Sequence, residues 1–300
     1  MTTMEELISG RNTAPIEISQ REAVDGLRRR FSHTLSSHAF ASLYLWRRNM
    51  KLGIYLTDNL FSVKCGIKGE NAWFFPCGEE EAVYDFIKSG MSEKSFKLVY
   101  MRNRDAEWLE RNFPGKWRIE RNIDDDEYIC DRMEYINAEG SKYSRARQKM
   151  NKLAREHTLK TEIISGDNLS AAFVVEREWE RTSLSISPDT LTEQGVFAET
   201  FENARELRIS GAVTYIDNIP SAVFAGFMLD DETLDIAIGK TLRSAPQGLV
   251  YYAMREYLKR YGENVKYCNL EEDLGISGMR SFKERLRPVG KNEISEAELL

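Results

Sequence analysis

The N-terminal half of the chain alternates apolar strand patterns with amphipathic helical stretches. "SQREAVDGLRRRF" has helical spacing, and Ser19 with Glu22 three residues later predicts a capping box at its start. "KLGIYLTDNLFSVKCG" predicts two strands joined by a hairpin around Thr57–Asn59. "AWFFPCG" and "FKLVYM" predict further strands. The amphipathic "EEEAVYDFIKSG" between them predicts a helix that Gly90 ends at its C′ position.

The second half begins with a basic helical stretch and continues with the same alternation. Helices are predicted at about 168–182 and 192–208, and strand hairpins around Asp217–Asn218 and Asp230–Asp231. "QGLVYYAMREYLKRYG" predicts a long helix ended by Gly262, and "VKYCNL" predicts a strand after it. Hairpins followed by a late strand–helix–strand unit predict an α+β fold with mixed, mainly antiparallel sheets flanked by helices.

The length predicts two domains. The chain has 300 residues, and single cores tend to divide beyond about 250–300 residues. The pattern changes where the acidic stretch "IDDDEYICDRMEYIN" gives way to the basic helix. We therefore predict one domain over residues 1–136 and a second over residues 137–300, the second carrying the candidate active site.

Composition narrows the class of protein. Hydrophobic residues make up 42% of the chain, and the net charge of −6 excludes a globally basic nucleic-acid binder while leaving room for a local basic patch. The four cysteines form no C-x-x-C pair, and the three histidines show no metal-ligand spacing, so no metal site is predicted. No signal peptide and no apolar run long enough to span a bilayer is present, which predicts a cytoplasmic protein. Peripheral contact with a membrane stays open.

The stretch "SKYSRARQKMNKLAR" is the clearest electrostatic feature. A helical wheel places Tyr143, Ala146, Met150 and Leu153 on one stripe, which predicts a buried face. The cations beside this stripe are Lys142, Arg145, Arg147, Lys149 and Lys152. They predict a phosphate-binding edge for the backbone of RNA, a nucleotide or lipid headgroups. The alternative is a solvated face balanced by acids such as those of residues 124–127.

The stretch "NLEEDLGISG", which contains three consecutive carboxylates, directly follows the predicted strand at residues 265–268. Strand ends in α/β layers face ligand crevices, so Glu271, Glu272 and Asp273 are candidate catalytic residues that would accept a proton or hold a cationic substrate. Asn269, Arg280 and Lys283 are candidate substrate-binding residues beside them. The alternative is a turn in which Asp273 or Ser277 caps the next helix.

The segment "RSAPQGLVYYAMREYL" stands where N-acetyltransferases that use acetyl-CoA cradle the pyrophosphate with a Q/R-x-x-G-x-G/A loop. Arg243 and Gly248 match the ends of that pattern and are candidate phosphate-binding residues. Pro246 stands where the first glycine belongs, and proline has no N–H to donate to a phosphate. The match supports the fold and argues against the use of acyl-CoA.

Three segments together resemble the phosphatidylglycerol lysyltransferase C-terminal domain family. They are "DDDEYICDRMEYINAEGSKYSRARQKMNKL", "GKTLRSAPQGLVYYAMREYL" and "KYCNLEEDLGISGMRSFKERLRP". With "SSHAFASLYLWRRNMKLGIY", the resemblance extends over roughly residues 30–290 and is strongest to a soluble bacterial branch without membrane spans. It implies two tandem GNAT-like (acyl-CoA N-acyltransferase-like) domains.

The resemblance also implies a transferase that moves an aminoacyl group from aminoacyl-tRNA to an amine or hydroxyl of a lipid or small-molecule acceptor. tRNA would then be a partner and aminoacyl-tRNA the donor substrate, with the basic helix holding its phosphates. Two alternatives stay open: an N-acyltransferase that uses acyl-CoA, and an inactive GNAT scaffold that binds RNA or an anionic surface.

Overall fold

The computed structural model describes residues 12–183 and 195–300. Its chain divides into two compact units. The first comprises the residues up to Glu127 together with Glu272–Ile276 and Asn292–Leu300. The second comprises Tyr128–Glu271 and Ser277–Lys291.

The first unit is a mixed sheet with helices. Its strands are β1 (Leu52–Leu56), β2 (Leu60–Cys65), β3 (Asn71–Phe74), β4 (Cys77–Gly78), β5 (Phe96–Met101), β6 (Trp117–Arg121) and β14 (Ser295–Leu299). Its helices are η1 (Ile18–Gln20), α2 (Arg21–Arg30), η2 (Ser36–His38), α3 (Phe40–Trp46), α4 (Glu80–Gly90) and α5 (Asn103–Asn112). The sheet order is β1-β2-β3-β5-β14-β6, with β4 beside β2, and only β3 and β5 pair in parallel.

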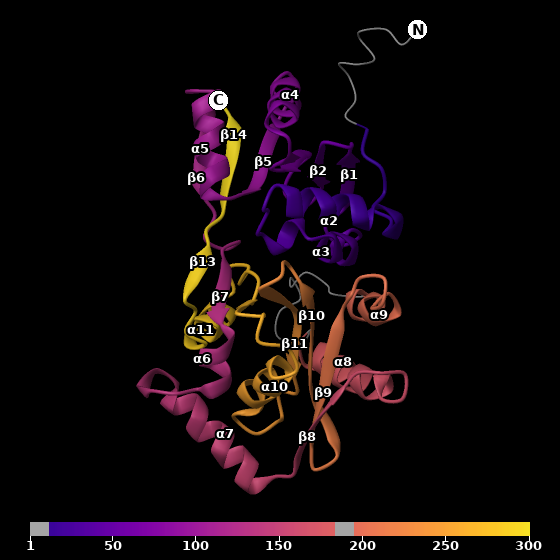
Figure 1. The fold of residues 1–300 in the computed structure, drawn as a ribbon, viewed down its shortest axis with the longest axis vertical. Coiled ribbons are helices and arrows are strands. Elements are labelled where there is room, and N and C mark those ends of the chain that lie inside the picture. The colour runs from indigo at the N-terminus through magenta and orange to yellow at the C-terminus, as the bar shows by residue number, and fades with distance from the viewer. Residues whose placement is uncertain (1–11, 184–194) are drawn as a thin grey trace. The chain divides into compact units, whose positions relative to one another are not determined.

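The second unit repeats this plan. Its strands are β7 (Glu127–Asp131), β8 (Leu159–Ile163), β9 (Ser210–Ile216), β10 (Ile219–Met228), β11 (Thr233–Thr241), β12 (Tyr267–Asn269) and β13 (Gly290–Asn292). Its helices are α6 (Arg132–Asn137), η3 (Ser141–Tyr143), α7 (Ser144–Glu156), α8 (Leu169–Ser183), α9 (Val196–Glu202), α10 (Leu249–Leu258) and α11 (Ser277–Arg285). The sheet order is β13-β7-β12-β11-β10-β9-β8, and β11 and β12 form its parallel pair (Figure 1).

The two sheets share one topological feature. Each contains a strand–helix–strand crossover, β3–α4–β5 in the first unit and β11–α10–β12 in the second. In each sheet the strand that pairs with the end of this crossover comes from the other half of the chain, β14 in the first sheet and β7 in the second. The predicted α+β class with two mixed, mainly antiparallel sheets flanked by helices is therefore confirmed.

Because of this exchange of strands, the boundaries of the observed units differ from those of the predicted domains. The prediction divided the chain at residues 136 and 137, whereas the units divide first at Glu127 and Tyr128. The C-terminal strand returns to the first sheet, because its residues pair with β5 and β6. Residues 272–276 also return to the first unit.

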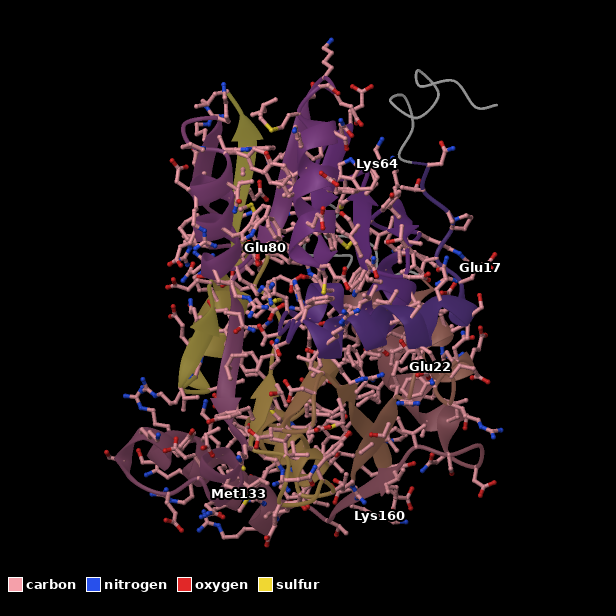
Figure 2. All side chains as sticks on the ribbon, turned by 45° about the horizontal axis from the view of Figure 1, so that its top comes forward. Glu17, Glu22, Lys64, Glu80, Met133 and Lys160 are labelled. Atoms are coloured by element: carbon pink, nitrogen blue, oxygen red, sulfur yellow. The ribbon has the colours of Figure 1, made fainter. Side chains whose placement is uncertain are left out.

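Apolar side chains between sheet and helices form the cores. In the first unit the cluster packs α4 and α5 against the sheet, and Trp73, Phe96 and Trp117 are buried in it. Glu80, labelled at the start of α4 in Figure 2, accepts a hydrogen bond of 2.8 Å from Trp108 Nε1. In the second unit α6, α7 and α10 pack on the sheet, with Tyr257 of α10 only 1% exposed.

The sequence predicted most helices and strands at their observed positions, but it placed some helix ends incorrectly. The hairpins around Thr57–Asn59 and Asp217–Asn218 are confirmed, the latter with positive φ at both turn residues. The capping box at Ser19 is wrong, because Glu17 and Gln20 form the box one turn earlier and Ser19 lies inside η1. The long helix α10 ends at Leu258, before Gly262. The first residues of the helix predicted at 192–208 lie outside the described residues.

Candidate functional site

In the second unit β11 and β12 pair over three residues and then part. The register runs from Thr233↔Tyr267 to Asp235↔Asn269. Beyond it β11 continues to Thr241 with no strand on that side in the part of the chain that the structure describes. Asp235 and Asn269 are both fully buried at the point of parting. Ligands of open α/β sheets bind at the carboxyl ends of parallel strands, so this end of the pair is where a substrate is expected.

The acidic segment that follows β12 is shared between the units. Glu271 belongs to the second unit, whereas Glu272 and Asp273 belong to the first. Asp273 is fully buried, and its Oδ1 accepts a hydrogen bond of 2.9 Å from the N–H of Gly275, which has φ +71°. Asp273 thus closes a turn ahead of α11, which begins at Ser277, so the hydrogen bond that it accepts belongs to this turn and not to a cap of the helix.

Glu271 lies two residues beyond the end of β12, where the sequence predicted a site residue. It is half-buried, with φ +56°, and its N–H donates to Asn269 Oδ1 over 2.8 Å. Left-handed backbone at a non-glycine residue stores strain and is concentrated at functional sites. The assignment of Glu271, Glu272 and Asp273 to catalysis stays a prediction, and the geometry favours Glu271 among them.

Two of the three predicted substrate-binding residues form hydrogen bonds at this strand end. Asn269 is fully buried and orients the backbone of Glu271. Lys283, on α11, is 9% exposed, and its Nζ donates to the carbonyl of Leu270. Arg280 is half-buried on the same helix. Asn269 and Lys283 therefore hold the end of β12 in place.

The basic helix α7 has the predicted buried face. Tyr143, Met150 and Leu153 are each at most 3% exposed, packed in the core of the second unit. Arg147 is half-buried, and its guanidinium donates hydrogen bonds to the carbonyls of Ala138 and Gly140. These two residues lie just after the C-terminal end of α6. Arg147 therefore stabilises the fold locally rather than joining the exposed cations.

The remaining cations, Lys142 of η3 and three residues of α7, are exposed. Lys142 pairs with Glu134, and Lys152 lies 3.9 Å from Glu156 one turn away. Arg145 and Lys149 are exposed, and the described part of the chain contains no ion pair to either. Of the acids at residues 124–127, Asp124 is exposed. Asp125, Asp126 and Glu127 are at most 4% exposed and are partnered within the first unit by Lys68, Arg121 and Ser36 respectively, so these three do not balance the cations of α7.

Helix α7 packs against the loop that begins α10 (Figure 1). Gly248, with φ +107°, lies so close that a Cβ placed on it would be 2.6 Å from the carbonyl oxygen of Lys149. Only glycine combines this backbone angle with this contact. Arg243 is exposed on the same loop, so the loop and the cations of α7 border one another.

The residues of this loop do not fit the pyrophosphate of acyl-CoA. Pro246 removes an N–H donor, and the backbone of α7 lies against Gly248, where a phosphate-binding loop needs open backbone. Acyl-CoA is therefore a poor fit to this loop.

A buried ion pair between α8 and β11 was not predicted from the sequence. Lys240 Nζ lies 2.7 and 2.8 Å from the two carboxylate oxygens of Glu176, and the two side chains are 6% and 5% exposed. The indole of Trp179 is 4.0 Å from the ammonium, measured to the ring centroid. The available signal was a lysine at an inward position of the apolar strand "TLDIAIGK".

These features agree with the comparison to known families. The model of the phosphatidylglycerol lysyltransferase C-terminal family matches residues 28–293. The chain belongs to this family. Membership supports a transferase of the GNAT fold, and among the described residues no helix has the length and apolarity to cross a membrane.

Solved structures show the same fold across the family. A protein of unknown function from Bacteroides thetaiotaomicron has a TM-score of 0.87 at 19% identity, over 96% of this chain and 99% of that one. L-PGS from Bacillus licheniformis has a TM-score of 0.65 at 15% identity, over 95% and 93%. The C-terminal domain of a putative lysylphosphatidylglycerol synthetase from Agrobacterium fabrum has a TM-score of 0.63 at 14% identity, over 94% and 92%. No curated protein matches the chain.

Proposed function

We propose that the protein transfers an aminoacyl group from aminoacyl-tRNA to an amine or hydroxyl of a lipid or small-molecule acceptor. The observation that carries the proposal is the exposed cation pair Arg145 and Lys149 on α7, beside the loop at Gly248 that begins α10. In a GNAT-like fold this loop lies on the donor side. A donor that carries many phosphates would neutralise these cations.

The character of the exposed face favours RNA over a membrane surface. A helix that lies in a membrane interface needs exposed apolar residues beside its cations. On α6 and α7, both fully described, Met133 is the one large hydrophobic residue that is strongly exposed, at 46% (Figure 2). The exposed face of α7 is otherwise polar and basic, which suits contacts with an RNA backbone.

The chemistry requires few groups. The oxygen or nitrogen of the acceptor attacks the ester carbonyl, the bond from that carbon to the ribose oxygen breaks, and the acceptor's proton ends on the released ribose hydroxyl. A carboxylate within reach of the acceptor assists by taking that proton first. Glu271, at the end of β12, is the residue that we propose for this role.

Charge reversal on α7 tests the proposal. We expect Arg145→Glu with Lys149→Glu to lower the affinity for aminoacyl-tRNA at least about tenfold in a filter-binding assay, because two phosphate contacts become repulsive. A control matched in charge is Lys259→Glu with Lys266→Glu, two exposed residues of the same unit that pair with Glu256 and Glu232. Equal affinity of the wild type and the α7 variant would remove tRNA as the donor.

The same protein also tests the acyl-CoA alternative. Because a ligand that binds the folded state raises the melting temperature, titration with CoA under thermal denaturation measures that binding directly. We expect no shift, given Pro246 and the contact at Gly248. A shift that saturates with CoA, together with no tRNA binding, would replace the proposal by the N-acyltransferase alternative.

A further inference from the structure

The first sheet ends in β6, whose outer side pairs with no strand in the described part of the chain (Figure 1). On its inner side, Asn122 donates its N–H to Ile294, and the carbonyl of Lys116 accepts from Leu300, so these residues point towards β14. Backbone groups of an antiparallel strand point alternately to its two sides. The N–H and carbonyl groups of three residues therefore point away from β14, where no described residue bonds to them. These residues are Trp117, Ile119 and Arg121.

Proteins usually protect such an edge with a proline, a β-bulge or repelling charges. β6 contains no proline, and its register with β14 runs without a shift from Trp117 to Arg121. The two residues between the outward-pointing ones are Arg118 and Glu120, whose side chains are 57% and 70% exposed. Their charges are opposite, so the edge has no excess of one sign that would repel a second copy of itself.

The charges of the neighbouring strands leave Glu120 poorly compensated. Glu120 lies directly opposite Glu296 of β14, and like charges directly opposite one another destabilise a sheet. Lys97 pairs with Glu296, whereas the ion pair of Glu120 among the described residues is to Arg118, at 3.5 Å. In the adjacent row of the sheet the sign alternates from strand to strand, through Lys97, Glu298 and Arg118. A further carboxylate beyond Arg118 would extend that alternation.

We infer that β6 pairs with β6 of a second copy of this chain, antiparallel and about a twofold axis at Ile119. In this register the outward-pointing residues exchange backbone hydrogen bonds, with Ile119 opposite Ile119 of the other copy. Arg118 of each copy then lies opposite Glu120 of the other. These are the positions without backbone hydrogen bonds, where side chains approach most closely. The alternation of charge continues across the junction, and two sheets become one. The inference does not depend on the proposed function.

Sedimentation velocity over a series of protein concentrations tests the association. Because one pair of strands is smaller than a standard interface, we expect a reversible dimer that is half-formed at about 10–100 µM. Ile119→Pro should stay monomeric over this range, since proline removes an N–H that the pairing with β14 does not use. Glu81→Arg, at an exposed position on α4, should dimerise as the wild type does. A wild type that is still monomeric at about 300 µM would overturn the inference.

Charge complementation tests the register and does not require the proline variant to fold. Arg118→Glu gives the edge two glutamates and Glu120→Arg gives it two arginines, so each variant alone places like charges opposite one another. We expect each to dimerise at least about tenfold more weakly than the wild type. An equimolar mixture of the two should form a heterodimer at about the wild-type affinity, because opposite charges then meet at every position. Single variants that dimerise like the wild type, or a mixture that associates no better than its components, would contradict this pairing.

Discussion

Two buried imidazoles in the first unit give its stability a predictable dependence on pH. The rings of His33 and His38 stack with centroids 3.9 Å apart, and His38 Nε2 lies 3.0 Å from the carbonyl oxygen of Phe75. Burial lowers the pKa of His38 to about 3, and burial with the neighbouring His38 lowers the pKa of His33 well below its ordinary value. His38 is therefore neutral in the folded protein at pH 5, where it is largely protonated in the unfolded chain, and the pKa of His33 is shifted in the same direction.

We expect the free energy of unfolding to be independent of these groups above pH 6.5 and to fall below it. The unfolded state then binds protons that the folded state does not, so each histidine removes about 1.4 kcal/mol per pH unit. His38→Phe should reduce that slope by one histidine's share between pH 6 and pH 4.5, because the pKa of His38 lies at about 3 in the folded protein. Tryptophan fluorescence in urea titrations measures it, because four of the five tryptophans lie in the first unit. Identical slopes for variant and wild type would contradict the assignment.

The close contact between α7 and the start of α10 can be tested by adding a single Cβ atom at Gly248. Gly248→Ala should destabilise the protein by about 2 kcal/mol or more, because the new Cβ meets the Lys149 carbonyl at a strained backbone angle. Gly278→Ala is the control: no atom lies within 4 Å of its Cβ position and it sits in α11, so we expect up to about 1 kcal/mol of stabilisation. Chemical denaturation followed by circular dichroism compares the two. A neutral Gly248→Ala would show that this contact is not tight.

At the scale of elements, sequence periodicity predicted most helices and strands but not how the sheets are shared. Leu153 and Met150 had the spacing of a buried helix face, and both are buried. The pairing of Ala297 with Leu98 depends instead on residues about 200 positions apart, which no local pattern encodes. The same limit applies to the acidic segment, because the sequence could not reveal that Glu271 and Glu272 belong to different units.

The exchange of strands predicts that the first unit needs the last residues of the chain. Ala297 of β14 is fully buried between β5 and β6, so Ala297→Asp would place a carboxylate in the core and should cost at least about 3 kcal/mol. Glu298→Ala, on the same strand but 48% exposed and paired with Arg118, should cost less than about 1 kcal/mol. Tryptophan fluorescence again reports on the first unit. Equal effects of the two substitutions would show that β14 does not stabilise this core.

At the scale of the whole molecule, an acidic chain carries a basic helix. The net charge is −6, yet α7 exposes Arg145, Lys149 and Lys152 beside the loop that begins α10. Long-range attraction to RNA is therefore weak, and binding should depend on a small number of local contacts. The sequence identified these cations because their spacing was helical, whereas it did not predict the buried ion pair of Glu176 and Lys240, which are 64 residues apart.

The most direct test of the account is the salt dependence of aminoacyl-tRNA binding. The logarithm of the affinity should fall linearly with the logarithm of the salt concentration, with a slope of about 0.7 to 0.9 for each phosphate contact. We expect Arg145→Gln with Lys149→Gln to reduce the slope by roughly 1.5 relative to the wild type, because two contacts are lost. An unchanged slope, or wild-type binding that does not respond to salt, would contradict the assignment of α7 to the phosphates of the donor.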